Sequence, residues 1–247
     1  MHLMGPLRIA MWSGPRNIST AMMRAWENRP DTSVWDEPLY GHFLAHTGMD
    51  HPMRQEILET CETDWRKTVR DLTGPVLDGT EIQFQKHMTQ HMLDHIDRGW
   101  MSEVTNCFLI RKPEQVIASY AAKRDHLTAA DLGFDRQAEV FEYVCENTGT
   151  VPPVLDARDV LIDPKGSLSK LCSVLGVEFS PAMLSWRTGL RESDGVWARH
   201  WYHAVEQSTG FAPYRENEIE LSDEHRAIAE AAQTSYAKLY RHRLVAD

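Results

Sequence analysis

The N-terminal segment constrains the fold most, because a short apolar run leads into a helix through a tight turn. Leu7 to Ser13 (LRIAMWS) has the length and composition of a buried strand, and Gly14-Pro15 ends it. The following AMMRAW has the composition of a helix, and the residues before it supply helix N-terminal side chains. A strand, a tight turn and a helix in succession are typical of the start of a parallel α/β sheet.

The rest of the chain continues this alternation. Further strands are expected at residues 32–35, 75–78, 106–110 and 154–156. Helices are expected at about residues 52–72, 85–98, 113–123, 131–146 and 164–175, with a last helix capped by Ser222. The sequence therefore predicts an α/β fold, with a central parallel sheet of about five strands and helices on both faces as in a P-loop-like three-layer sandwich. We expect a single domain over residues 1–247.

Charge and composition narrow the classes of partner. The formal net charge of −10 disfavours sequence-independent binding to nucleic acid or to an anionic membrane. No apolar run approaches the roughly 20 residues that cross a bilayer, and no signal peptide is expected. The four cysteines form no C-x-x-C pair, which favours free thiols and a reducing compartment, the cytoplasm.

The turn after the first strand has the features of a phosphate-binding loop. Unpaired backbone N–H groups at the start of a helix attract anions, and Arg16 adds a full charge. The loop lacks the second glycine and the lysine of a Walker A motif, which weakens a Mg-ATP kinase interpretation. A plain turn with a capping serine and a surface arginine remains the alternative. The candidate anion-binding residues are Gly14, Pro15, Arg16, Asn17, Ile18, Ser19 and Thr20.

A second candidate anion site follows the strand at residues 106–110. Arg111 stands at the carboxyl end of that strand, where ligands of parallel sheets bind. Ser119 comes eight residues later, about two helical turns along the next helix. Arg111 and Ser119 are therefore placed to share one phosphate, with a surface arginine and a packing serine as the alternative.

These two segments together resemble the donor-binding signatures of sulfotransferases. The first is P-R-x-x-S-T at residues 15–20, and the second is R-x-P-x-x-x-x-x-S-Y at residues 111–120. A third stretch, residues 159–179, is similar to a mainly structural region of the family. The resemblance implies 3′-phosphoadenosine 5′-phosphosulfate as donor, with its 5′-phosphosulfate on Arg16, Ser19 and Thr20 and its 3′-phosphate on Arg111 and Ser119. It implies sulfuryl transfer to a hydroxyl or amine of a small acceptor, without a metal.

The chain also departs from the family pattern. Asn17-Ile18 stands where the family usually has Ser-Gly, and isoleucine does not easily adopt positive φ, so a different loop backbone is expected. The glycine-rich C-terminal loop of the family is not cleanly present, and residues 191–197 are the most similar segment. A nucleotide-dependent phosphotransferase or hydrolase on the same fold, and a catalytically silent nucleotide-binding relative, therefore stay open as alternatives.

Two positions are candidates for the base that activates the acceptor. Glu37 follows the second strand and resembles the base of some bacterial sulfotransferases; alternatively it pairs with Arg16 or caps a helix. Lys86 and His87 resemble a Lys and a His of other sulfotransferases, with His87 as base and Lys86 as a cation near the transferred group. The sequence does not decide between Glu37 and His87.

Two further groups of residues stand out. The segment from Trp197 to His203 mixes aromatic and basic side chains, so Trp197 and Arg199 are expected to contact the donor, with the acceptor wall or a core loop as alternatives. His87, His91 and His95 are spaced like metal ligands on a helix, but the H-E-x-x-H pattern is broken by Met88, and no metal is expected.

Overall fold

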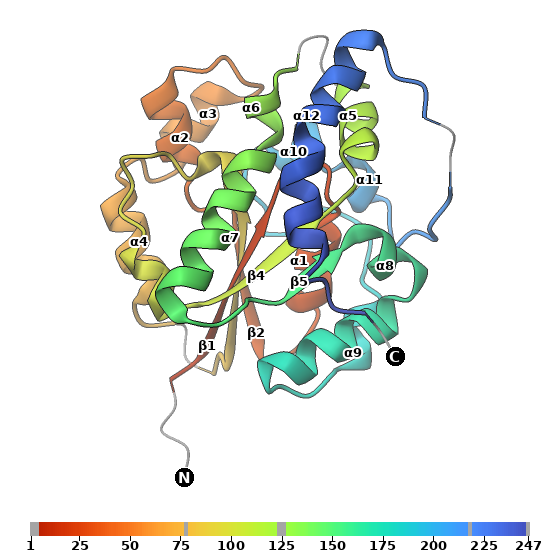
Figure 1. The fold of residues 1–247 in the computed structure, drawn as a ribbon. Coiled ribbons are helices and arrows are strands. Elements are labelled where there is room, and N and C mark those ends of the chain that lie inside the picture. The colour runs from red at the N-terminus through yellow and green to blue at the C-terminus, as the bar shows by residue number, and fades with distance from the viewer. Residues whose placement is uncertain (1–4, 77–78, 123–126, 217–218, 246–247) are drawn as a thin grey trace.

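The computed structural model describes residues 5–76, 79–122, 127–216 and 219–245 (Figure 1). In these residues five parallel strands form one sheet in the order β2-β3-β1-β4-β5. The strands are β1 (Leu7–Ser13), β2 (Thr32–Asp36), β3 (Ile82–Met88), β4 (Thr105–Ile110) and β5 (Val154–Asp156). The predicted α/β class and parallel sheet are confirmed.

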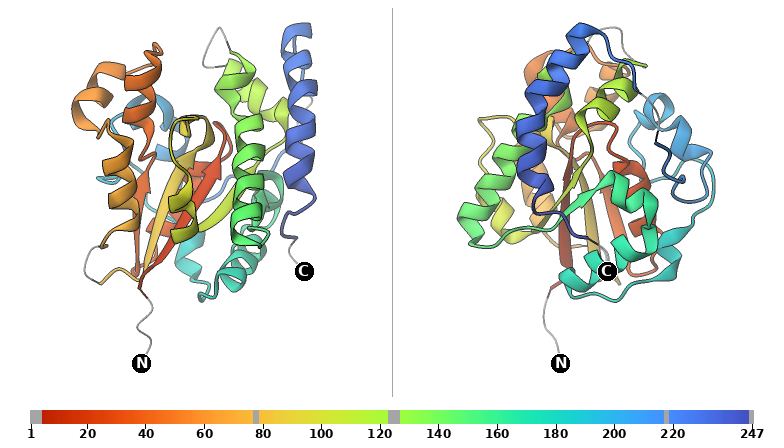
Figure 2. Two further views of the ribbon diagram at one scale, coloured as in Figure 1. Left: turned by 60° about the vertical axis from the view of Figure 1, so that its left-hand side comes forward. Right: turned by 45° about the vertical axis from the view of Figure 1, so that its right-hand side comes forward.

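Helices cover both faces of the sheet, because successive side chains of each buried strand point to opposite sides (Figure 2). In β1, Ala10 and Trp12 join one apolar cluster while Ile9 and Met11 join the other. The first cluster packs under α4 (Trp65–Thr73), α5 (Pro113–Ala121), α7 (Phe134–Thr148) and α12 (Asp223–Tyr240). The second packs under α1 (Ser19–Glu27), α2 (Tyr40–Thr47), α3 (Arg54–Thr60), α8 (Ala157–Ile162) and α9 (Pro164–Leu175).

Short elements complete the connections between these layers. They are α6 (Ala129–Leu132), α10 (Ala198–Trp201), α11 (His203–Glu206) and the 3₁₀ turns η1 (Thr89–His91), η2 (Gly99–Glu103) and η3 (Pro181–Leu184). The last helix begins as predicted, since the Ser222 hydroxyl accepts a hydrogen bond from the His225 N–H at 3.2 Å. No helix within the described residues is long and apolar enough to cross a bilayer.

The predictions for residues 75–98 were wrong. Pro75 and Val76 are not in a strand, and residues 77 and 78 lie outside the described part. The third strand is instead Ile82–Met88, and its second half overlaps the segment from residue 85 that was expected to be helical. Its polar side chains obscured a strand that is buried throughout: for example, Gln85 Nε2 donates to the Leu72 carbonyl at 2.9 Å and to Gln83 Oε1 at 2.8 Å. Partners from other elements outweighed local composition here.

This change places Lys86 and His87 on opposite faces of the sheet. The His87 ring stacks on Trp12 at 4.3 Å and lies 5.7 Å from Trp100. His87 Nε2 donates to Gln85 Oε1 at 3.2 Å, since an amide oxygen only accepts. Burial lowers the pKa of His87 to about 3, so the ring is neutral and belongs to the core rather than to the sheet edge.

We predict that His87→Phe makes the protein less sensitive to acid. In the wild type, the folded state holds His87 neutral while the unfolded chain takes up a proton below about pH 6.5, so stability is lost as the pH falls from there toward the folded-state pKa. At pH 5 this loss amounts to about 2 kcal/mol for one such histidine. Urea unfolding of both proteins at pH 7 and pH 5 measures it.

The same replacement at the exposed residue His203 serves as the control, because it adds a phenylalanine without touching the core. An equal loss of stability between the two pH values in the wild type and in His87→Phe would contradict the core assignment of His87.

Candidate active site

A cavity of about 1230 Å³ lies at the carboxyl edge of the sheet, where parallel sheets bind ligands. The turn after β1, the residue after β2 and the end of β3 line one part of it. The η1 turn, α2, α5 and the segments 129–139 and 201–215 line most of the rest. The topology therefore gathers segments from the whole chain around one hollow.

The β1–α1 turn is held tightly in place. A Cβ on Gly14 would lie 2.7 Å from the Leu132 carbonyl oxygen, so only glycine fits this approach. The buried Asn17 side chain donates from Nδ2 to the Leu109 carbonyl at 3.1 Å, which ties the loop to β4. Gly14 thus supports the loop from behind, and residues 15–20 line the cavity.

The loop backbone is strained. Arg16 has φ 60° and Ile18 has φ 56°, so the expectation that Ile18 avoids positive φ was wrong. Among the described residues, Glu37 and Met53 are the other non-glycine residues at positive φ, and Glu37 also lines the cavity. Such conformations cost about 1–3 kcal/mol each and concentrate at ligand clamps. The strain at Arg16, Ile18 and Glu37 therefore makes this edge a candidate binding site.

The start of α1 adds an anion-binding end to the loop. The first bond of the helix runs from the Met22 N–H to the Ile18 carbonyl at 3.0 Å. The N–H groups of Ser19, Thr20 and Ala21 therefore have no partner within the helix and carry its positive dipole end. All three residues line the cavity, so this end is placed to bind a phosphate or sulfate group.

The two predicted anion-binding segments meet directly. Arg16 Nε donates to the Ser119 hydroxyl at 3.0 Å, and Arg111 Nη1 donates to the Arg16 carbonyl at 2.8 Å. Arg111 is also held by Gln115, whose Oε1 accepts from Arg111 Nε at 3.1 Å. The structure thus joins the loop to the start of α5 along one wall of the cavity.

Neither arginine forms an ion pair with a carboxylate in the described part of the chain. Burial lowers the pKa of Arg16, and burial together with Arg16 lowers the pKa of Arg111. Because a guanidinium stays charged in proteins, two half-buried cations line the cavity. Among the described residues no carboxylate forms an ion pair with them, although the nearby Asp156 acts against the lowering of the Arg111 pKa. An anion with two separate charged groups would compensate them.

A buried charge cluster forms another part of the cavity lining. The Lys86 ammonium, 1% exposed, donates to Asp36 Oδ1 at 2.8 Å, to the Tyr202 hydroxyl at 2.7 Å and to Glu37. Burial opposes the charge on Lys86, but Asp36 and Glu37 outweigh it and raise the Lys86 pKa well above its ordinary range. The Gly195 N–H donates to the other oxygen of Asp36 at 3.1 Å. The cluster therefore connects β2, β3 and the C-terminal segment.

Glu37 is the carboxylate of this cluster that lines the cavity. Burial and the neighbouring Asp36 raise the Glu37 pKa, against the opposing effect of Lys86. Its second oxygen lies 4.0 Å from His91 Nδ1. Burial lowers the pKa of His91 well below its ordinary value, so this imidazole is neutral. Glu37 is thus a carboxylate whose proton affinity burial increases, the property of a general base.

Sequence reasoning missed the aromatic wall near Glu37. The Tyr40 ring stacks on His91 at 4.5 Å, and its hydroxyl bonds to His51. His51 in turn stacks on Trp201 at 5.4 Å. All four line the cavity. The aromatic composition of residues 197–203 was the only sequence signal for this wall. Tyr40, His51 and His91 come from other segments, and the fold brings them next to Trp201.

The structure places two predicted donor contacts elsewhere. Trp197 is buried and donates from Nε1 to the Tyr202 hydroxyl at 3.1 Å, so it supports the Lys86 cluster from behind. Arg199 is exposed and pairs with Glu56 at 3.1 Å. Neither they nor His87 line the cavity, whereas Tyr202 from the same segment does.

Comparisons with known proteins agree with this architecture. A family described as "Sulfotransferase domain" matches residues 7–240. A sulfotransferase from Alicyclobacillus acidocaldarius has a similar structure, with a TM-score of 0.56 at 11% identity over 98% of both chains. The sulfotransferase domain of the Synechococcus PCC 7002 olefin synthase reaches 0.51 at 15% identity, over 92% of this chain and 94% of that chain. At such identities the likeness shows the fold alone.

Two curated relatives from Arabidopsis thaliana are more similar in sequence. Branched-chain-amino-acid aminotransferase-like protein 2 is 36% identical over 205 residues, or 83% of this chain and 36% of that protein. Branched-chain-amino-acid aminotransferase-like protein 1 is 34% identical over 240 residues, or 96% of this chain and 42% of that protein. The chain therefore spans less than half the length of these relatives. Because the family match extends over most of the chain, the chain belongs to the sulfotransferase domain family.

Proposed function

We propose that the protein transfers a sulfuryl group from 3′-phosphoadenosine 5′-phosphosulfate to a hydroxyl or amine of a small acceptor. The observation that carries this proposal is the hydrogen-bonded link from Arg111 through Arg16 to Ser119. It joins two anion-binding segments on one wall, next to the start of α1. A donor with phosphate groups at both its 5′ and 3′ positions presents two separated anions, which matches two cations that form no ion pair within the described residues.

In this proposal the 5′-phosphosulfate lies on the loop of residues 15–20, and the 3′-phosphate lies between Arg111 and Ser119. Backbone N–H groups at the start of α1 and the Arg16 guanidinium stabilise the charge that develops on the transferred group. The acceptor oxygen or nitrogen attacks sulfur, the bond from sulfur to the bridging phosphate oxygen breaks, and the nucleotide leaves as 3′-phosphoadenosine 5′-phosphate. The acceptor proton passes to Glu37.

Lys86 has a positioning role in this scheme. Its ammonium holds one Glu37 oxygen, so the other oxygen is directed toward the cavity. The aromatic wall formed by Tyr40, His51, His91 and Trp201 supplies the acceptor end of the cavity. Flat apolar surfaces with a few polar atoms favour a small, partly apolar acceptor over a polyanion, in keeping with the net charge of −10.

We also propose that the protein works in a reducing compartment, the cytoplasm. Cys61, Cys107, Cys145 and Cys172 are all free, and two of them are buried. This pattern supports the proposal because oxidising compartments favour paired cysteines.

The donor assignment predicts saturable binding of 3′-phosphoadenosine 5′-phosphate without Mg²⁺. Arg16→Ala and Arg111→Ala should each weaken binding at least tenfold, since a hydrogen bond to a charged group contributes about 1.5–3 kcal/mol. Arg199→Ala is the matched control, because it removes an exposed arginine that does not line the cavity. Isothermal titration calorimetry of the four proteins gives the affinities.

The outcome also separates the alternative functions. Absence of binding to this nucleotide, with tight binding of ATP and Mg²⁺, would favour a phosphotransferase or hydrolase. Binding of the nucleotide without transfer of sulfur to any hydroxyl or amine in an acceptor screen would favour a silent nucleotide-binding protein.

The base assignment predicts that Glu37→Gln lowers the turnover rate about 10²–10⁴-fold while leaving nucleotide affinity nearly unchanged. A base must be deprotonated to act, and burial raises the Glu37 pKa. The acid limb of the wild-type rate profile should therefore lie above the ordinary range of a glutamate. The measurement is transfer of radiolabelled sulfur to an acceptor from the screen, as a function of pH.

Glu56→Gln, which alters a half-buried carboxylate on α3 that does not line the cavity, provides the control for the Glu37 variant. Full activity in Glu37→Gln, with an unchanged acid limb, would show that another group accepts the proton.

A further inference from the structure

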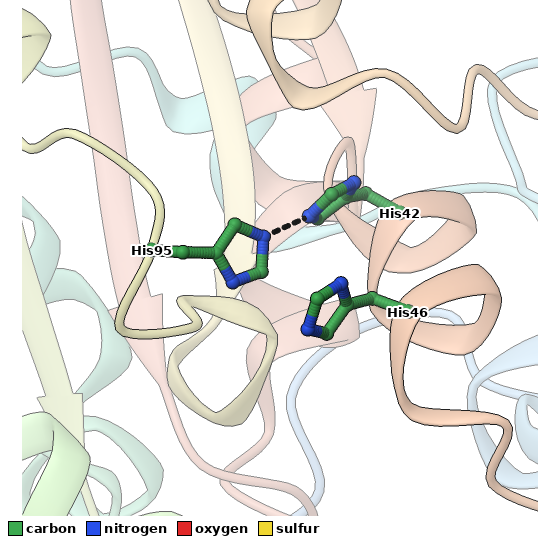
Figure 3. A group of neighbouring side chains, drawn as sticks. All are labelled: His42, His46 and His95. Carbon is green, nitrogen blue, oxygen red and sulfur yellow. Dashed lines mark hydrogen bonds between the residues drawn. The ribbon is translucent and has the colours of Figure 1, made fainter.

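Three histidines from two distant segments converge beside the cavity (Figure 3). His42 and His46 are one helical turn apart on α2, and His95 follows the η1 turn. Each contributes a ring nitrogen, and these three atoms lie within 4.8 Å of one another. The predicted helical stripe of His87, His91 and His95 does not exist, because the chain there forms β3 and η1; instead His95 meets the histidines of α2.

His42 is already oriented as a ligand. Its Nδ1 lies 2.7 Å from the Thr63 carbonyl, which only accepts, so Nδ1 carries the proton. The lone pair is then on Nε2, which faces His95 Nε2 at 2.8 Å. A backbone carbonyl on one ring nitrogen, with the other nitrogen free to bind, is the arrangement typical of metal-ligating histidines. Because His42 is buried, this orientation is fixed by the fold.

The other two histidines are exposed and adaptable. His46 and His95 have ring centroids 4.1 Å apart. A neutral imidazole keeps a lone pair on one ring nitrogen, and an exposed side chain is free to turn this nitrogen toward a bound cation.

We propose that His42, His46 and His95 bind one divalent transition-metal ion of the Zn²⁺ class. Three imidazoles with water in the fourth position are a known zinc ligand set. Zn–N bonds of about 2.0–2.1 Å place tetrahedral ligand nitrogens about 3.3 Å apart. The hydrogen bond between His42 and His95 then opens slightly, and the widest pair of nitrogens closes. Rotamer changes of the two exposed side chains achieve this.

The metal would join two segments that line the cavity. On α2, Tyr40 and Phe43 line the cavity while His42 and His46 lie on a neighbouring face of the helix. His91 and Leu93, close to His95 in sequence, also line the cavity, and the His91 ring packs against Tyr40 and Phe43. A metal bridge from α2 to residue 95 fixes the spacing of these two segments. The site takes no part in sulfuryl transfer, and the inference does not rest on the proposed function.

Metal titration of the untagged full chain tests the site. Calorimetry should give one Zn²⁺ per chain, and Co²⁺ should give the visible absorption bands of a low-coordinate nitrogen site. His46→Ala and His95→Ala, both changes of exposed residues, should each weaken Zn²⁺ binding at least about tenfold. His203→Ala, another exposed histidine, should bind like the wild type.

Two results would overturn the proposal. One is absence of saturable binding at submillimolar Zn²⁺. The other is equal affinity in the wild type and in the His46 and His95 variants. The bridging role has its own readout, since Zn²⁺ should slow hydrogen exchange in residues 40–47 and 89–96. Metal binding with unchanged exchange in both segments would contradict the bridge.

Discussion

The structure of the site depends on one buried cation, the Lys86 ammonium. It compensates Asp36 and Glu37, which follow each other at the end of β2, and it bonds to Tyr202 from the C-terminal segment. Removing one partner from such a buried cluster typically costs about 3–5 kcal/mol, because the remaining charges stay desolvated. The cluster therefore requires β2, β3 and residues 195–202 to meet at one point. These contacts form one part of the cavity lining and fix the position of Glu37.

The candidate anion-binding wall differs from this cluster, because its two arginines form no ion pair with a carboxylate of the described residues. The protein carries a net charge of −10, yet Arg16 and Arg111 face the cavity with no carboxylate partner in the described residues. The loop that holds Arg16 is strained at Arg16 and Ile18, and it packs too closely on Leu132 for any side chain at Gly14. The chain thus has a local basic site despite its negative net charge, as the proposed anionic donor requires.

Local patterns in the sequence predicted most of the strands and the two donor signatures. The features that were missed depend on contacts between distant segments. Apolar runs identified β1, β4 and β5. The two donor signatures could be recognised because each lies within ten consecutive residues, at residues 15–20 and 111–120. β3 was missed because Gln85, Lys86 and His87 look polar until their partners on other elements are known. The aromatic wall and the cluster of His42, His46 and His95 could not be predicted from the sequence for the same reason, because each brings together residues from distant segments.

A crystal structure of the protein with bound 3′-phosphoadenosine 5′-phosphate would show whether Arg16 and Arg111 hold the donor. We expect the 5′-phosphate on the backbone N–H groups at the start of α1, the 3′-phosphate between Arg111 and Ser119, and Glu37 facing the open acceptor end of the cavity. A nucleotide bound away from the loop of residues 15–20, or with neither phosphate in contact with Arg16 or Arg111, would contradict this expectation.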